Sequence, residues 1–256
     1  MPASSASRTA KACLAVVALS FLSAASADAA GLRVFASNGV KAAIQALTPQ
    51  LEKASGGPLA IEFSTTADLR QRIDKGEPFD VAILTDDAMS ALAKEGKLSP
   101  MQTRVARVGI GVGYRKGAQK PDVTAAVAVK QSLLNAKAIA YTPNGASFPT
   151  IDKMVQRLGI AKQFQQKSRL TGPGAAPAAV AHGDADLVIT LISEILPEPG
   201  VVLAGPLPSE FQSYLGFSAA PSPKAAADPH VAALIAFLQT APAGAVYVAK
   251  GMQVPQ

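Results

Sequence analysis

The sequence predicts an α/β protein made of two successive runs of alternating strands and helices. Short apolar stretches alternate with longer segments in which apolar residues recur every three or four positions, the spacing of one helical face. Glycine and proline interrupt the chain between these segments. A long strand-like segment at residues 104–114 joins the two runs, and the chain returns near residues 212–220. Alternating strands and helices favour parallel sheets with right-handed crossovers.

The first run contains three strand–helix units. The first helix carries its apolar face on Val40, Ala43, Ile44, Leu47 and Leu51. Glycines end the first two helices, and Thr85 is the expected N-cap of the third. We expect strands at 32–36, 59–63 and 81–84, and helices at 40–54, 68–75 and 86–95.

The second run begins with the strand at 104–114. Its Gly109-x-Gly111-x-Gly113 lacks the third glycine of a dinucleotide loop, so we expect a strand that allows close backbone approach, not a phosphate loop. We expect further strands at 138–141, 169–171, 187–191 and 215–219, and helices at 124–134, 148–158, 175–182, 230–240 and 243–250.

The first 29 residues have the pattern of a cleavable signal peptide. Arg8 and Lys11 precede an apolar stretch at 12–25, and Ala27-Asp28-Ala29 fits the A-x-A cleavage motif. A buried N-terminal helix is the alternative, but it should show a polar face, and this stretch has none. We therefore expect export to the periplasm. No other stretch has 18 uninterrupted apolar residues.

Composition excludes several classes of function. The net charge is +6, but no run of four Lys or Arg occurs, so we expect no nucleic-acid partner. With one cysteine, Cys13 in the predicted signal peptide, and two histidines, His182 and His230, we expect no transition-metal site. Both histidines are expected to be structural, and no cofactor is expected.

Four polar loops each follow an expected strand and precede a helix. They are Ser37-Asn38-Gly39, Ser64-Thr65-Thr66, residues 142–147 with Ser147, and Gly172-Pro173-Gly174. Helix N-termini carry free N–H groups and a partial positive charge, and such loops gather at the carboxyl ends of strands. One loop alone would indicate ordinary N-capping. Two from each run favour an anion-binding cleft.

The whole chain after residue 30 resembles the periplasmic molybdate-binding proteins of ABC transporters, which are type II solute-binding proteins. The resemblance rests on distributed motifs. They are Val34-Phe35-Ala36-Ser37, Phe63 to Leu69, Ile73-x-x-Gly76-x-Pro78-x-Asp80-Val81-x-Ile83, Leu158-Gly159, Ser193-Glu194 and Gly244-x₆-Gly251. It implies two α/β lobes, 30–108 plus 216–256 and 109–215, joined by two hinge strands that close on a ligand. It also implies a monomer that delivers a small anion to an ABC permease.

The ligand set of that family is only partly present. Its two serines and one tyrosine correspond here to Gly39, Thr66 and Leu191, and Thr190 lies beside the last. Two of the three hydroxyl donors are therefore replaced, which favours an anion larger than molybdate. The expected ligand-binding residues are Ser37, Asn38, Gly39, Thr65, Thr66, Arg70, Ser147, Gly174 and Thr190.

Two cations suggest a second function. Lys41 and Arg70 fall in the first turns of their helices, where their positive charge opposes the helix dipole. Such a position is tolerated on a solvated surface, and it would also suit a cleft that binds a polycarboxylate. Bacterial aconitate isomerases resemble molybdate-binding proteins, so an isomerase that shifts a proton between cis- and trans-aconitate is the alternative. The sequence alone identifies no catalytic base for it.

Overall fold

The computed structural model describes residues 31–254, and the predicted signal peptide lies outside the described residues. The strands are β1 (Leu32–Ser37), β2 (Leu59–Ser64), β3 (Val81–Thr85), β4 (Thr103–Arg115), β5 (Ile139–Tyr141), β6 (Ser168–Leu170), β7 (Leu187–Leu191), β8 (Val201–Pro206) and β9 (Tyr214–Pro221). The helices are η1 (Asn38–Val40, a 3₁₀ turn), α1 (Lys41–Ser55), α2 (Thr66–Asp74), α3 (Asp86–Lys94), α4 (Ala126–Asn135), α5 (Phe148–Arg157), α6 (Ala161–Gln166), α7 (Ala176–His182), α8 (Ile192–Ile195), α9 (Pro229–Phe237) and α10 (Ala241–Ala249).

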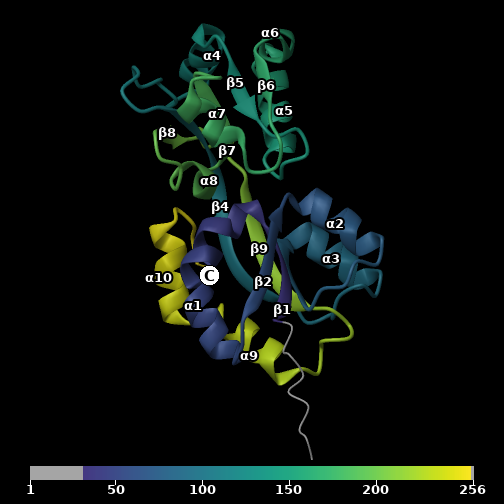
Figure 1. Ribbon diagram of the computed structural model, residues 1–256. Coiled ribbons are helices and arrows are strands. Elements are labelled where there is room, and N and C mark those ends of the chain that lie inside the picture. The colour runs from purple at the N-terminus through teal and green to yellow at the C-terminus, as the bar shows by residue number, and fades with distance from the viewer. Residues whose placement is uncertain (1–30, 255–256) are drawn as a thin grey trace, which may run out of the picture. The chain divides into compact units, whose positions relative to one another are not determined.

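One mixed sheet runs through the described residues (Figure 1). Its strand order is β2-β1-β3-β9-β4-β7-β5-β6, and β8 also pairs with β4. In each run the strands joined by helices pair in parallel, β1 with β2 and β3, and β5 with β6 and β7. The predicted α/β class and parallel pairing are confirmed.

Strand β4 belongs to both halves of the sheet. Residues 103–109 pair antiparallel with β9, and residues 110–115 pair antiparallel with β7 and β8. The partner changes between Gly109 and Ile110, where the Gln212 side chain accepts from the Ile110 N–H at 2.8 Å and donates to the Ile110 carbonyl at 2.9 Å. We call β2, β1, β3 and β9 the first half, and β7, β5, β6 and β8 the second half.

The glycines of β4 allow close packing, as predicted. A Cβ atom at Gly111 would lie 2.8 Å from Leu203 and 2.9 Å from Ile192. One at Gly113 would lie 2.8 Å from Val188 and 2.9 Å from Val201. Neighbouring side chains therefore occupy the space that a larger residue would need, and neither glycine forms part of a phosphate loop.

The predicted helix faces form the core. Ala43, Ile44, Leu47 and Leu51 of α1 are each no more than 1% exposed. Helix α1 packs against α9 and α10. No single helix in residues 31–254 is long and apolar enough to span a membrane, although α9 and α10, bent by 54°, pass that test as a pair on length and composition.

Several local expectations need correction. Helix α2 begins at Thr66 instead of Asp68, because the Thr65 hydroxyl caps it by accepting from the Asp68 N–H at 3.1 Å. Thr85 is the N-cap residue of α3 but its side chain makes no capping hydrogen bond. Helices α6 and α8 and strand β8 were not predicted. The two helices are too short to show a helical period, and β8 ends in Gly205-Pro206.

Candidate functional site

A small pocket lies at the carboxyl ends of five strands, where the two halves of the sheet meet. Its lining comes from the last residues of β1 and β7 and from the loops or helices that follow β1, β2, β5, β6 and β7. The twelve lining residues are Ser37, Asn38, Thr65, Thr66, Thr142, Gly145, Ala146, Ser147, Gly174, Thr190, Leu191 and Glu194. The structure thus brings together all four predicted loops and seven of the nine predicted ligand residues, Gly39 and Arg70 being the other two. We call this the interstrand pocket.

Hydroxyl groups dominate the polar lining of the interstrand pocket. Thr66 donates to the Ser37 hydroxyl at 3.2 Å, so the Ser37 proton remains for another acceptor. The Thr142 hydroxyl lies 3.2 Å from the Thr171 hydroxyl and 3.2 Å from the Gly172 carbonyl, and was not predicted as a site residue. Helices α2 and α5 begin at this pocket. The first N–H groups of α2 have no partner inside the helix. In α5 the N–H groups of Phe148 and Thr150 donate to the Gly145 and Ser147 carbonyls, and Pro149 has none.

Asn38 presents an unsatisfied donor to this pocket. Its side chain is 8% exposed, and its Nδ2 is the buried side-chain nitrogen that has no hydrogen-bond partner within the described residues. Gly174, with φ of +70°, brings its backbone against this amide, where a Cβ atom would lie 3.2 Å from Nδ2. A buried amide without a partner costs about 1–3 kcal/mol, so a ligand that accepts from it gains that energy back.

Glu194 is a pocket residue that sequence reasoning missed. It lies in α8, one turn after Thr190, whose hydroxyl donates to its carboxylate. Burial raises the pKa of the Glu194 carboxyl, and the hydrogen bond from Thr190 and the charge of Lys41 oppose part of that rise. Ser193-Glu194 marked the family resemblance, but a carboxylate is not expected in an anion site, so the pattern gave no reason to place it there.

Gly39 lies behind the interstrand pocket and does not line it. A Cβ atom at this position would lie 2.4 Å from the Phe217 ring and 2.7 Å from the Leu191 side chain. Its carbonyl accepts from the Ser193 hydroxyl at 2.7 Å. Gly39 therefore lets Phe217 and Leu191 fill the place where a serine side chain would project.

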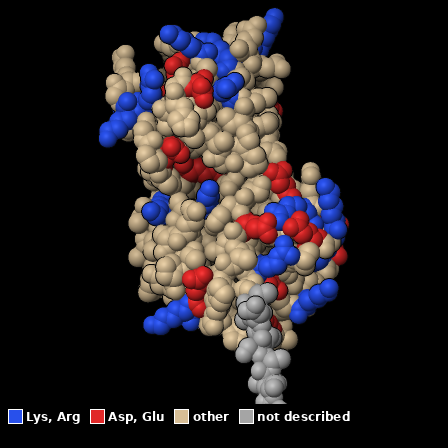
Figure 2. Space-filling view, in the orientation of Figure 1, with Lys and Arg blue, Asp and Glu red and all other residues tan. Residues whose placement is uncertain are grey.

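Arg70 does not reach into the interstrand pocket, which differs from the expectation. Its guanidinium donates to Asp74 at 3.1 Å and to Glu95. Lys97 pairs with the same two carboxylates, at 2.6 Å from Asp74 and 3.0 Å from Glu95. Acidic and basic groups accordingly lie side by side over α2 and α3 (Figure 2). These neighbouring acids explain the orientation of the Arg70 side chain. Arg70 and Thr66 also line a neighbouring opening.

A hydrogen bond closes the rim between the two halves. The Asn144 side chain, in the loop after β5, donates to Asp68 in the first turn of α2 at 2.8 Å. The other Asp68 oxygen accepts from Ser64 at 3.0 Å. The free volume of the pocket is about 10 Å³, room for about one water molecule. A ligand larger than a water molecule does not fit in this arrangement.

Replacing Asn144 by alanine is expected to weaken ligand binding about two- to tenfold, because the closed arrangement loses one exposed hydrogen bond to a carboxylate. Titration calorimetry with the ligand found in the screen below measures this. Gln131→Ala is the matched control, since it removes an exposed amide hydrogen bond of 2.9 Å to Asn135 within α4 alone. Equal affinities for both variants would contradict a role of Asn144 in closure.

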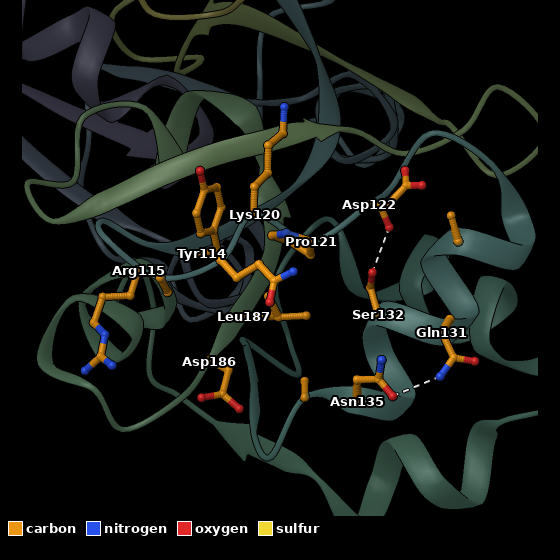
Figure 3. Close-up of a pocket in the computed structure, with 14 residues that line it drawn as sticks. Tyr114, Arg115, Lys120, Pro121, Asp122, Gln131, Ser132, Asn135, Asp186 and Leu187 are labelled. Atoms are coloured by element: carbon orange, nitrogen blue, oxygen red, sulfur yellow. Dashed lines mark hydrogen bonds between the residues drawn. The ribbon is translucent and has the colours of Figure 1, made fainter.

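A larger cavity of about 560 Å³ lies apart from the loops described above, beside the end of β4 and α4 (Figure 3). Two of its polar contacts are local. Ser132 donates to the Asp122 carbonyl at 2.7 Å, and Gln131 to Asn135 at 2.9 Å. The buried amide without a partner and the four polar loops lie at the interstrand pocket instead, so we place the candidate site there.

Among the described residues, no group of three or more His, Cys, Asp or Glu side chains lies close enough together to hold a metal ion. His182 ends α7 beside Gly183, and the His230 ring nitrogen Nδ1 lies 2.7 Å from the Ser55 carbonyl. Both histidines lie outside the interstrand pocket.

Comparison with known proteins agrees with this architecture. The structure is similar to the periplasmic molybdate-binding protein of Azotobacter vinelandii (TM-score 0.74, 18% identity, 88% of this chain and 100% of that chain). It is also similar to the sulfate-binding protein SubI of Mycobacterium tuberculosis (TM-score 0.66, 15% identity, 88% and 86%). An aconitate isomerase of a Pseudomonas species is 29% identical over 199 residues, 74% of each protein.

The two halves with a pocket at their strand ends have the fold of a type II periplasmic binding protein, as predicted. Residues 32–253 match the profile of the bacterial extracellular solute-binding proteins, and the chain belongs to that family.

Proposed function

We propose that this solute-binding protein is exported to the periplasm, binds a small oxyanion or carboxylate in the interstrand pocket, and delivers it to an ABC permease. In this proposal residues 30–108 plus 216–256 and residues 109–215 form two lobes that move about β4 and β9. Strand β4 pairs with β9 up to Gly109 and with β7 from Ile110 onward. A bend between these two residues would therefore break no pairing with a single neighbouring strand, which supports that boundary. Binding as a monomer is part of the same proposal.

The observation that carries the proposal is the unpartnered Asn38 amide in a closed pocket lined by hydroxyls. A set of hydroxyl and amide donors beside two helix N-termini favours an acceptor-rich, negatively charged ligand. Two similar structures are named as molybdate-binding and sulfate-binding proteins, which supports a ligand of this kind. The signal-peptide pattern and the membership in an extracellular family support export.

A thermal-shift screen of the purified protein tests anion binding. The seven anions are molybdate, tungstate, sulfate, phosphate, citrate, cis-aconitate and trans-aconitate. A ligand at about 100 times its Kd stabilises the folded state by about 2.7 kcal/mol, which raises the Tm by several degrees. Asn38→Ala should reduce the affinity for that ligand about tenfold or more, the effect of losing a hydrogen bond to a charged group.

Two variants are controls for this screen. Asn135→Ala removes the same side chain from the surface of α4, and Arg70→Ala removes a guanidinium that pairs with Asp74 and Glu95. Both should keep the wild-type affinity. A shift of under about 1 °C with all seven anions would contradict anion binding, and an equal loss in all three variants would contradict the placement of the site.

An isomerase acting on aconitate is the second candidate, and one observation favours it. The pocket holds a carboxyl group, Glu194, in a chain that is 29% identical to an aconitate isomerase. A proton shift between two carbons of aconitate needs a group that accepts and returns a proton. Incubation with cis- and trans-aconitate followed by chromatography decides between the candidates: interconversion that Glu194→Gln abolishes supports the isomerase, and binding without turnover supports transport.

A further inference from the structure

Glu194 differs in hydrogen-bonding capacity from every other polar side chain that lines the interstrand pocket. The lining hydroxyls and the Asn38 amide each carry at least one proton that can be donated. An ionised carboxylate accepts only. Among the twelve lining residues Glu194 alone ionises. When it is ionised, its carboxylate repels any anion that cannot donate a hydrogen bond to it.

The surrounding charges do not neutralise Glu194 by contact. Helix α8 packs against β4, β7, β8, η1 and α1. Strands β7 and β8 and the turn η1 carry no charged side chain. From α1, Lys41 acts on the carboxyl through its charge, but its Nζ lies 5.9 Å from the centre of the Phe63 ring and makes no ion pair with Glu194 within the described residues. The arginines of β4, at positions 104, 107 and 115, lie towards the two ends of that strand.

Thr190 leaves the carboxylate with accepting capacity to spare. Its hydroxyl donates to one Glu194 oxygen, and a carboxylate has about four acceptor positions. A ligand that brings a hydroxyl or an acidic proton to this edge of the pocket gains a charge-assisted hydrogen bond. A ligand of the same shape without that proton meets repulsion in a poorly hydrated space.

We propose that Glu194 selects the ligand, so that the pocket takes small anions that bring their own proton donor and rejects matched anions that have none. Hydroxycarboxylates and hydrogen phosphate share this chemistry. The selection rests on the anion-binding function proposed above and restricts it, since fully deprotonated tetrahedral oxyanions such as molybdate and sulfate are then poor ligands at neutral and alkaline pH.

Two pairs of probes test the selection by titration calorimetry at pH 8. Citrate is compared with tricarballylate, which lacks the hydroxyl, and phosphate with sulfate. The wild-type protein should prefer the donor-bearing member of at least one pair roughly 10- to 100-fold, the size of one hydrogen bond to a charged group. Glu194→Gln should bind both members of that pair within about threefold, because the neutral amide both donates and accepts. Glu198→Gln, four residues along and outside the pocket lining, is the control that should keep the preference.

A pH series on the wild-type protein gives a second readout that needs no variant. Sulfate does not change its protonation between pH 5 and pH 8. Because burial raises the pKa of Glu194, its carboxyl gains a proton as the pH falls and then donates to sulfate. Sulfate affinity should therefore rise towards pH 5 in the wild type and Glu198→Gln, and stay level in Glu194→Gln.

The outcomes separate this selection from anion binding itself. Equal affinity for both members of each pair at pH 8, or tight binding of molybdate, overturns the selection while anion binding stands. Failure of all four probes to bind also overturns the selection. If the seven-anion thermal screen is blank as well, anion binding falls with it.

Discussion

Replacing Phe217 by alanine is expected to destabilise the protein by about 3–5 kcal/mol, as truncation of a buried phenylalanine commonly does. Phe217 is 1% exposed and lies on β9, paired in register with Thr85 of β3 and Ala106 of β4. Its ring fills the space against Gly39, so its loss leaves a cavity where β1 passes into η1. Urea unfolding followed by circular dichroism measures the change in the free energy of unfolding.

Tyr214→Ala is the control for this experiment. Tyr214 is an aromatic residue of the same strand but is 52% exposed, so its truncation should cost less than about 1 kcal/mol. A cost below about 1 kcal/mol for Phe217→Ala as well would show that Phe217 does not hold β9 against η1.

Gly39→Ser is expected to destabilise the protein by about 1–3 kcal/mol, the usual cost of overpacking a core. The new Cβ would lie 2.4 Å from the Phe217 ring and 2.7 Å from Leu191, so one of these side chains must leave its place. The serine should not increase molybdate affinity, because its side chain points into packed atoms and not into the interstrand pocket. Thermal unfolding and molybdate titration measure the two effects.

Gly57→Ser controls for the loss of a glycine, since nothing lies within 4 Å of a Cβ atom at Gly57, and its cost should stay within about 0.5 kcal/mol. The double variant Gly39→Ser/Phe217→Ala should be more stable than the sum of the two single changes predicts, because alanine frees the space that serine needs. Additive costs would contradict the contact, and a gain in molybdate affinity from Gly39→Ser would contradict the position of Gly39.

Most of the fold could be predicted from residue spacing. The buried face of α1 and the parallel pairing of β1 with β2 and β3 follow from local periodicity and from the order of the elements. The ends of elements were less accurate. The start of α2 depends on the Thr65 cap, and α8 has four residues, too few for a period to appear.

The residues of the candidate site were found in part because parallel strands end at the same edge of a sheet. Ser37, Thr66, Ser147 and Gly174 were expected to converge for that reason, and they line one pocket. The prediction that Arg70 lies in the pocket rested only on its own positive charge. Spacing could not show that Asp74 and Glu95 lie within reach of its guanidinium, since Glu95 belongs to another helix.

By itself the sequence determined the α/β class, the strand and helix order, and the loops that meet at one edge, because these depend on neighbours within a few residues along the chain. Only the tertiary structure decided which side chains fill that edge. Phe217 and Leu191 take the space beside Gly39, and Glu194 is brought to the pocket by a turn after β7. Such contacts join residues more than 100 positions apart, and their steric fit and charge depend on distances that no local pattern contains.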